Sequence, residues 1–166
     1  MLYFAYGSNM SSARLIQRVP SAVQIDIGLL HSHRIEFHKV GFRDGSAKCD
    51  AFATGNAQDF IAGVLYKIVP EQRDLLDMEE GLGHGYEVKT VNIKTLSGQN
   101  LNAFTYYATK INPALKPFHW YKHHVVWGAK EHDLPGNYVD RIISTDSIED
   151  FNTSRVENEL SVYIKQ

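Results

Sequence analysis

The sequence predicts an α+β fold: a largely antiparallel or mixed sheet that can close into a small β-barrel, with helices flanking it. Three observations support this class. Strand-like patterns dominate residues 1–108, short turn-forming segments connect several of them, and helical patterns dominate after residue 117. The chain of 166 residues contains no repeat or linker, so we expect one domain over residues 1–166.

Composition narrows the class of protein. A hydrophobic content of 43% and a formal net charge of -2 are typical of a soluble globular chain. Lysine and arginine do not cluster, and no apolar run is long enough to cross a bilayer. No basic segment precedes an apolar stretch at the N-terminus, and Cys49 is the one cysteine. We therefore expect a cytoplasmic protein with no signal peptide, no disulfide framework, and no nucleic-acid or membrane partner.

The chain begins with a strand that enters a helix through a tight turn. Residues 2–6 (LYFAY) are an apolar and aromatic run typical of a buried strand, and residues 11–19 follow a helical pattern. Between them, Gly7, Ser8 and Asn9 favour a turn. Such a turn leaves backbone N–H groups over the strand end, where they can bind an anion or an oxyanion. The alternative is that these three residues only connect the strand to the helix and have no function.

Strand-like and helical segments alternate in the following order. We expect strands over 22–30, 34–40, 51–54 and 60–69, with an exposed loop over 41–50. A helix over 71–80 follows Pro70 and ends at Gly81, and two strands over 86–95 and 101–108 form a hairpin. The last helices are expected over 118–130, 138–143 and 149–165, the last with Val156, Leu160 and Ile164 at a spacing of four. The buried sides are expected to be Ala13, Ile16 and Val19 in the first helix and Val23, Ile25, Ile27 and Leu29 in the second strand.

Two adjacent glutamates end the predicted helix over 71–80. Glu79 lies four residues after Leu75, and Glu80 lies four residues after Leu76, so each shares a helix face with a leucine. At least one carboxylate therefore lies near apolar surface, which raises its pKa and suits it to proton transfer near neutral pH. Periodicity does not decide which of the two faces inward, and a solvated helix end is the alternative.

Other chemistry-bearing residues have weaker patterns. His119 and His123 are four apart on a predicted helix, and His31 and His33 share a strand face, but no further ligand stands at a supporting distance. We therefore expect no metal site. Cys49 lies in the predicted polar loop without a nucleophile signature, and Ser8 lacks the G-x-S-x-G motif.

Several of these segments together resemble the γ-glutamylcyclotransferase family. The resemblance is carried by residues 3–9 (YFAYGSN), 76–81 (LDMEEG) and 85–86 (GY), and extends to Tyr121-Lys122, to residues 128–131 (GAKE) and to Leu134-Pro135. It covers residue 1 to about the start of the last helix. Each segment is short, but their order and spacing together are specific.

The resemblance implies a small mixed barrel with flanking helices and a cavity at the end of the first strand. It also implies cyclisation of a small-molecule γ-glutamyl substrate to 5-oxoproline, with release of an amine or amino acid and without a cofactor or metal. The residue before the helix-ending glycine is the family's acid/base, which assigns that role to Glu80. The family's substrate-binding positions are Tyr6, Gly7, Ser8, Asn9, Tyr86, Tyr106 and Tyr121 in this sequence.

Substrate choice is less well defined. Tyr86 is followed by Glu87-Val88, whereas the γ-glutamylamine branch carries Tyr-Arg-Arg, so the sequence favours a γ-glutamyl amino acid. The alternatives are an enzyme acting on a γ-glutamyl amine or a γ-glutamylated pathway intermediate, and a small-molecule binding protein without catalysis. Product formation separates the last from the others. The C-terminal helical segments are also a candidate face for a homodimer, although they contain no heptad repeat.

Overall fold

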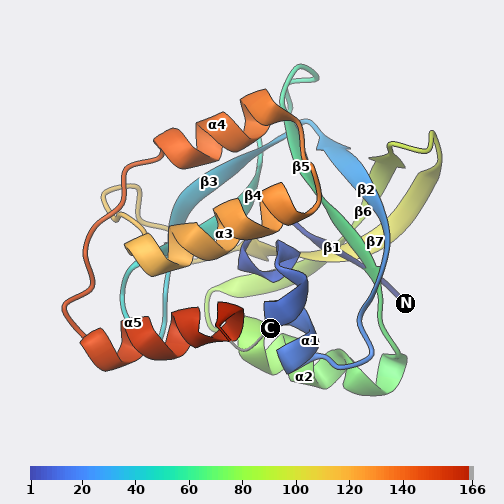
Figure 1. Cartoon of the computed structure of the whole chain (residues 1–166). Coiled ribbons are helices and arrows are strands. Elements are labelled where there is room, and N and C mark those ends of the chain that lie inside the picture. Colours follow the sequence, from blue (N-terminus) through green and yellow to red (C-terminus); the bar gives the residue numbers. More distant parts are fainter. Residues whose placement is uncertain (165–166) are drawn as a thin grey trace.

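Five strands form a closed barrel on the right-hand side of the molecule in Figure 1. The computed structural model describes residues 1–164. Around the barrel the strands run in the order β1 (Leu2–Ala5), β5 (Phe60–Lys67), β2 (Val23–His31), β6 (Tyr86–Thr95) and β7 (Asn100–Ala108). All neighbours are antiparallel except β1 and β7, whose parallel pairing through Tyr3 and Phe104 closes the barrel. The predicted α+β class with a small mixed barrel is therefore confirmed.

A separate two-stranded sheet stands beside the barrel. It consists of β3 (His33–Val40) and β4 (Ala47–Ala53). The buried carboxylate of Asp50 joins it to the barrel, because Oδ2 lies 2.8 Å from His38 Nε2 and Oδ1 accepts a hydrogen bond from the backbone N–H of Ala108 at 2.7 Å. The expected exposed loop over 41–50 is wrong in its second half. Residues from Ala47 onward form β4, and this strand packs against β7.

Within residues 1–164, five helices cover one side and one end of the sheets (Figure 1). They are α1 (Ser12–Arg18), α2 (Arg73–Glu80), α3 (His119–Glu131), α4 (Gly136–Ser144) and α5 (Thr153–Leu160). Short 3-10 turns precede α1 (Ser8–Met10) and α2 (Pro70–Gln72) and follow α5 (Ser161–Tyr163). Figure 1 shows α3 beside α4, and α1 and α2 at the end of the barrel nearest α5. The helix expected over 149–165 is thus shorter, Ile164 is exposed, and Lys165 lies outside the described residues.

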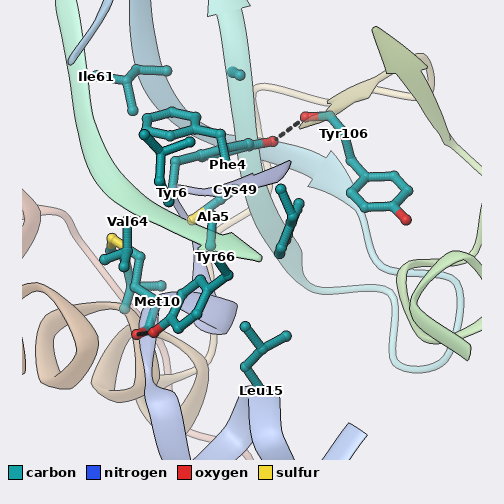
Figure 2. Packing of buried hydrophobic residues seen from close by; sticks show 14 of the residues in the cluster. Phe4, Ala5, Tyr6, Met10, Leu15, Cys49, Ile61, Val64, Tyr66 and Tyr106 are labelled. Carbon is teal, nitrogen blue, oxygen red and sulfur yellow. Dashed lines mark hydrogen bonds between the residues drawn. The ribbon is translucent and has the colours of Figure 1, made fainter. Parts of the chain in front are cut away.

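The core is built around β1, which is buried on both sides (Figure 2). Phe4 and Ala5 are fully buried, and Gly63 on β5 lets β1 approach. A Cβ at Gly63 would lie 2.5 Å from the Ala5 carbonyl oxygen and 2.7 Å from the Phe4 ring, so no larger residue fits. The tight packing holds the C-terminal end of β1, and with it the turn that follows, in one position.

Two predicted faces are wrong in part. Val19 is fully buried as expected, but within α1 the buried residues are Arg14 and Leu15 and Ile16 is exposed, because the helix packs its opposite side inward. In β2, Ile27 and Leu29 pack against the core as expected, but the register shifts between Gln24 and Asp26, and this irregularity leaves Val23 and Ile25 exposed. Within residues 1–164, no helix has the length and apolar character needed to cross a membrane.

Candidate active site

The turn after β1 presents backbone donors. Within residues 1–164, the N–H groups of Gly7, Ser8 and Asn9 donate to no protein acceptor, although Ser8 and Asn9 are buried. Packing at Gly7 is close, since a Cβ there would lie 3.2 Å from Cys49 Cβ, and Cys49 would have to shift by a few tenths of an ångström to admit it. Buried N–H groups are normally paired, so three unpaired donors in succession, two of them on buried residues, form a ready site for an anion or oxyanion.

Glu80 lies opposite this turn at the end of α2. The helix ends there because Gly81 adopts a left-handed conformation with φ of 72°, and its N–H returns to the carbonyls of Asp77 and Met78. Glu80 Oε1 accepts a hydrogen bond of 2.7 Å from the side-chain amide of Asn9, and Arg18 Nη1 lies 3.7 Å away. A second bond, from Arg18 to Asn9 Oδ1 at 2.9 Å, orients the amide so that its NH₂ group faces the glutamate.

The environment of Glu80 favours its protonated form. Only 16% of the side chain is exposed, and this burial raises the pKa of the carboxyl. The positive charges of Arg18, Arg14 and Lys39 and the Asn9 hydrogen bond lower the pKa in turn, but they do not cancel the effect of burial. A raised pKa makes this carboxylate a stronger proton acceptor than that of an exposed glutamate, which suits it to proton transfer.

The structure distinguishes the two glutamates that periodicity leaves equivalent. Leu76 is fully buried and Leu75 is 40% exposed, so the helix face shared by Leu76 and Glu80 is the inner one. Glu79 is directed toward Arg18 and Arg43, at 3.8 and 3.5 Å, at the mouth of the cavity.

The four tyrosines expected at the site all line the recess around Glu80. Their hydroxyl groups bond to the framework: Tyr6 donates to the carbonyl of Tyr106 at 2.8 Å (Figure 2), Tyr121 accepts from the N–H of Cys49 at 3.0 Å, Tyr86 donates to the carbonyl of Cys49, and Tyr106 donates to Asp77. The rings therefore shape the recess, and Glu80 is the group among these residues that is free to exchange protons.

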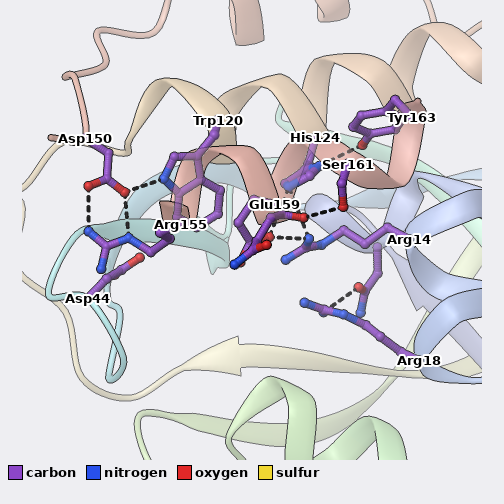
Figure 3. Close-up of polar contacts among 12 residues, drawn as sticks. Arg14, Arg18, Asp44, Trp120, His124, Asp150, Arg155, Glu159, Ser161 and Tyr163 are labelled. Carbon is purple, nitrogen blue, oxygen red and sulfur yellow. Dashed lines mark hydrogen bonds and ion pairs between the residues drawn. The ribbon is translucent and has the colours of Figure 1, made fainter. Parts of the chain in front are cut away.

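The cavity has two parts. An inner recess lies between the turn and the tyrosines, and an outer cavity of about 130 Å³ opens from it. Ser8, Glu80, Tyr86 and Tyr121 line both parts. The outer wall is charged, with Arg14, Arg18, Lys39, Arg43, Lys48 and Arg155 facing Asp44, Glu79, Glu80 and Glu159. Figure 3 shows how α5 joins this wall through the pair of Glu159 with Arg14, at 2.6 Å.

Some residues at the site, among them Tyr3, Arg18 and Lys39, are absent from the set expected from the sequence. Tyr3 lies in the inner recess, where its hydroxyl accepts a hydrogen bond of 3.2 Å from Asn9. Arg18 contacts Asn9 and Glu80, and Lys39 faces the outer cavity from β3. The sequence contains a pattern that could have identified Lys39 as a site residue. It continues the alternation of Ile35 and Phe37 on a strand face that is otherwise apolar.

The structure also places the histidines that were considered as metal ligands and the cysteine that was considered as a nucleophile. Within residues 1–164, no three histidine, cysteine, aspartate or glutamate side chains are grouped so that they could hold a metal ion. His119 contacts Ser147, and His33 contacts Lys89. Cys49 lies in β4 rather than in a polar loop, and burial raises the pKa of its thiol to about 12, which makes it a poor nucleophile.

Comparisons with known proteins agree on one family. A model of the AIG2-like family matches residues 60–142. The γ-glutamylcyclotransferase of Homo sapiens is 30% identical over 168 residues, which cover 99% of this chain and 88% of the human protein. The γ-glutamylcyclotransferase of Bos taurus is 30% identical over 146 residues, 86% of this chain and 77% of the bovine protein. A solved structure of a γ-glutamyl cyclotransferase shares the fold with a TM-score of 0.87 at 24% identity, covering 99% of this chain and 98% of that one.

Proposed function

The chain belongs to the γ-glutamylcyclotransferase family of AIG2-like proteins, and on that premise we propose that it converts a γ-glutamyl amino acid into 5-oxoproline and the free amino acid. The observation that carries the proposal is the pairing of Glu80 with the turn. A buried carboxyl with a raised pKa lies 2.7 Å from Asn9, beside three N–H groups that have no acceptor within residues 1–164. Proton transfer and oxyanion binding are the two requirements of an intramolecular acyl transfer.

In the proposed reaction, the substrate's own α-amine is the nucleophile. It attacks the γ-carbonyl carbon, a C–N bond closes the five-membered ring, and the bond to the leaving nitrogen breaks. The α-ammonium nitrogen loses two protons as it becomes the lactam N–H, and the released amine gains two as it becomes an ammonium. Glu80 can carry protons from one nitrogen to the other because it returns to its starting form after each transfer.

The turn stabilises the oxyanion that forms during the proposed reaction. The tetrahedral intermediate places a negative charge on the former γ-carbonyl oxygen, and the N–H groups of Gly7, Ser8 and Asn9 are donors already held in place by the packing of β1. The rings of Tyr86 and Tyr121 wall the cavity and restrict the flexible glutamyl chain. Holding the amine close to the carbonyl lowers the entropic cost of ring closure.

The substitution Glu80→Gln tests the proposal. It keeps the size of the side chain and removes its ability to transfer protons, so 5-oxoproline formation should fall by about 10²–10⁴-fold. The matched control is Glu71→Gln, whose side chain is exposed in the turn before α2 and lines neither part of the cavity. We expect the control to retain activity within a few-fold. Equal losses in the two variants would contradict the assignment of the proton shuttle to Glu80.

A substrate panel separates the related activities. Matched γ-glutamyl dipeptides, γ-glutamyl amines and intact glutathione are assayed for 5-oxoproline release under the same conditions. We expect the γ-glutamyl dipeptides to give the highest kcat/KM. Higher turnover of the amines would assign the protein to amine substrates, and tight binding without product from any compound would favour a binding protein.

A further inference from the structure

One cation of the outer cavity wall, Lys39, stands apart from the ion pairs found among the described residues. The five others are paired: Arg14 with Glu159, Arg18 with Glu80, Arg43 with Glu79, Lys48 with Asp44 and Arg155 with Asp150, at 2.6, 3.7, 3.5, 2.8 and 2.6 Å. Lys39 is 1% exposed and takes part in none of the ion pairs found within residues 1–164. A buried ammonium is costly without an anion, so this position is poised to receive one.

The surroundings of Lys39 hold it in place without neutralising it. Its Nζ lies 4.4 Å from the ring centroid of Tyr86 and 5.6 Å from that of Phe42. A Cβ at Gly85 would lie 3.3 Å from Lys39 Cε, so the chain also packs closely on this side. Burial lowers the pKa of Lys39 to about 8, and the Glu80 charge opposes that effect. A carboxylate that enters the cavity would add a stronger opposing charge.

The position of Lys39 indicates which part of a substrate it meets. Glu80 and Ser8 line both the inner recess and the outer cavity, whereas Lys39 lines only the outer one. A γ-glutamyl group that reacts between Glu80 and the turn directs its leaving group away from the recess. The leaving group therefore occupies the outer cavity, where the unpaired ammonium stands.

We infer that Lys39 binds the carboxylate of the leaving amino acid, and that this contact makes the enzyme select γ-glutamyl amino acids over γ-glutamyl amines. The inference rests on the proposed cyclisation. It assigns to β3 a specificity-determining residue that lies outside the turn, the tyrosines and Glu80.

The kinetic test compares substrates that differ in one charge. They are γ-glutamylalanine, its C-terminal amide, and the analogue in which the glutamyl α-carboxylate is an amide. A charge-assisted contact predicts that the wild type prefers γ-glutamylalanine to its C-terminal amide by about 10- to 100-fold in kcat/KM. In Lys39→Gln this preference should disappear, because activity toward the acid falls to the level measured for the C-terminal amide with the same variant.

A matched control removes the same charge elsewhere. Lys94 is exposed on β6, pairs with Asn100 on β7 and does not line the cavity. Lys94→Gln should keep the wild-type preference. A preference that survives in Lys39→Gln would overturn the inference. So would a Lys39→Gln loss that appears with γ-glutamylalanine and with its C-terminal amide but not with the glutamyl α-amide analogue, since Lys39 would then bind the glutamyl carboxylate.

Binding to Glu80→Gln separates this inference from the proposed reaction. Calorimetry with this variant should show γ-glutamylalanine binding more tightly than its C-terminal amide by a similar factor, and adding Lys39→Gln should remove the difference. If the wild type forms no 5-oxoproline but the binding difference depends on Lys39, the carboxylate site stands and the cyclisation fails. Equal binding of acid and amide would overturn the carboxylate site even if turnover is observed.

Discussion

Gly128 controls how closely α3 approaches the turn of the active site, and replacing it by alanine tests that role. A Cβ at Gly128 would lie 2.4 Å from the backbone nitrogen of Ser11 and 2.6 Å from the carbonyl carbon of Met10. Those atoms follow directly on Asn9. They are held on the other side as well, because the Met10 carbonyl accepts hydrogen bonds from Tyr66 at 2.8 Å and from His132 at 2.9 Å if that ring nitrogen carries the proton.

The size of the effect follows from these contacts. Ordinary contacts of a Cβ begin at 3.4 Å, so the helix and the turn must separate by about 1 Å. Overpacking of this kind costs about 1–3 kcal/mol, and alanine returns up to about 1 kcal/mol through its higher helix propensity. We expect a net loss of roughly 1–2 kcal/mol in the free energy of unfolding, which lowers Tm by about 2–8 °C in a chain of this size. A 1 Å displacement of the turn should also lower kcat/KM by about 100-fold.

The matched control is Gly136→Ala at the start of α4. A Cβ there meets no atom within 4 Å, so the substitution should stabilise the protein by about 0.5–1 kcal/mol through helix propensity alone. Thermal unfolding and initial rates are measured for both variants. If Gly128→Ala is as stable and as active as Gly136→Ala, the close approach of α3 does not position the turn.

Three further predictions concern charge. Because burial raises the pKa of Glu80, its ionisation destabilises the folded state, so Glu80→Gln should gain Tm relative to the wild type as pH rises from 4 to 8. A difference in Tm that does not change with pH would contradict this. Asn9→Asp replaces the donor 2.7 Å from Glu80 by a second carboxylate, and kcat/KM should fall at least about 10-fold; wild-type kinetics would exclude a role for the amide. Burial lowers the pKa of His124 from 6.5 to about 4, so the unfolded chain binds a proton that the folded one does not between these values. The wild type should therefore lose stability as pH falls from 6.5 to 4, and urea unfolding of His124→Gln should show a smaller loss.

The elements that the sequence predicts well are those with local causes. The strand over 86–95 is observed with those bounds, and the helix expected over 71–80 ends at Glu80 because Gly81 can adopt the left-handed conformation that terminates it. The turn at Gly7, Ser8 and Asn9 follows for the same reason, since glycine and short polar side chains favour it wherever the chain lies.

Which side of a helix or strand is buried was less predictable from the sequence, because it depends on the elements against which that helix or strand packs. The apolar pattern of α1 allows either side to face inward, and contacts with the rest of the fold bury Leu15 and leave Ile16 exposed. Residues 47–50, the first half of β4, contain no strand pattern in the sequence. They adopt an extended conformation because they pair with β3. Cys49 is consequently part of the recess wall rather than of a loop.

The sequence alone determines the components of the candidate site: a strand that stops at a glycine-containing turn, and two glutamates at a helix end, one of which meets apolar surface. Local backbone preferences are sufficient for that much. The assembly depends on long-range contacts. The approach of α2 to the turn brings Glu80 within 2.7 Å of Asn9 across 71 positions of the chain. The packing of β3 leaves Lys39 buried and outside the ion pairs found within residues 1–164. Distances and dielectric surroundings of this kind arise only when the barrel closes, and they convert an ordinary carboxylate and an ordinary lysine into groups with altered pKa values.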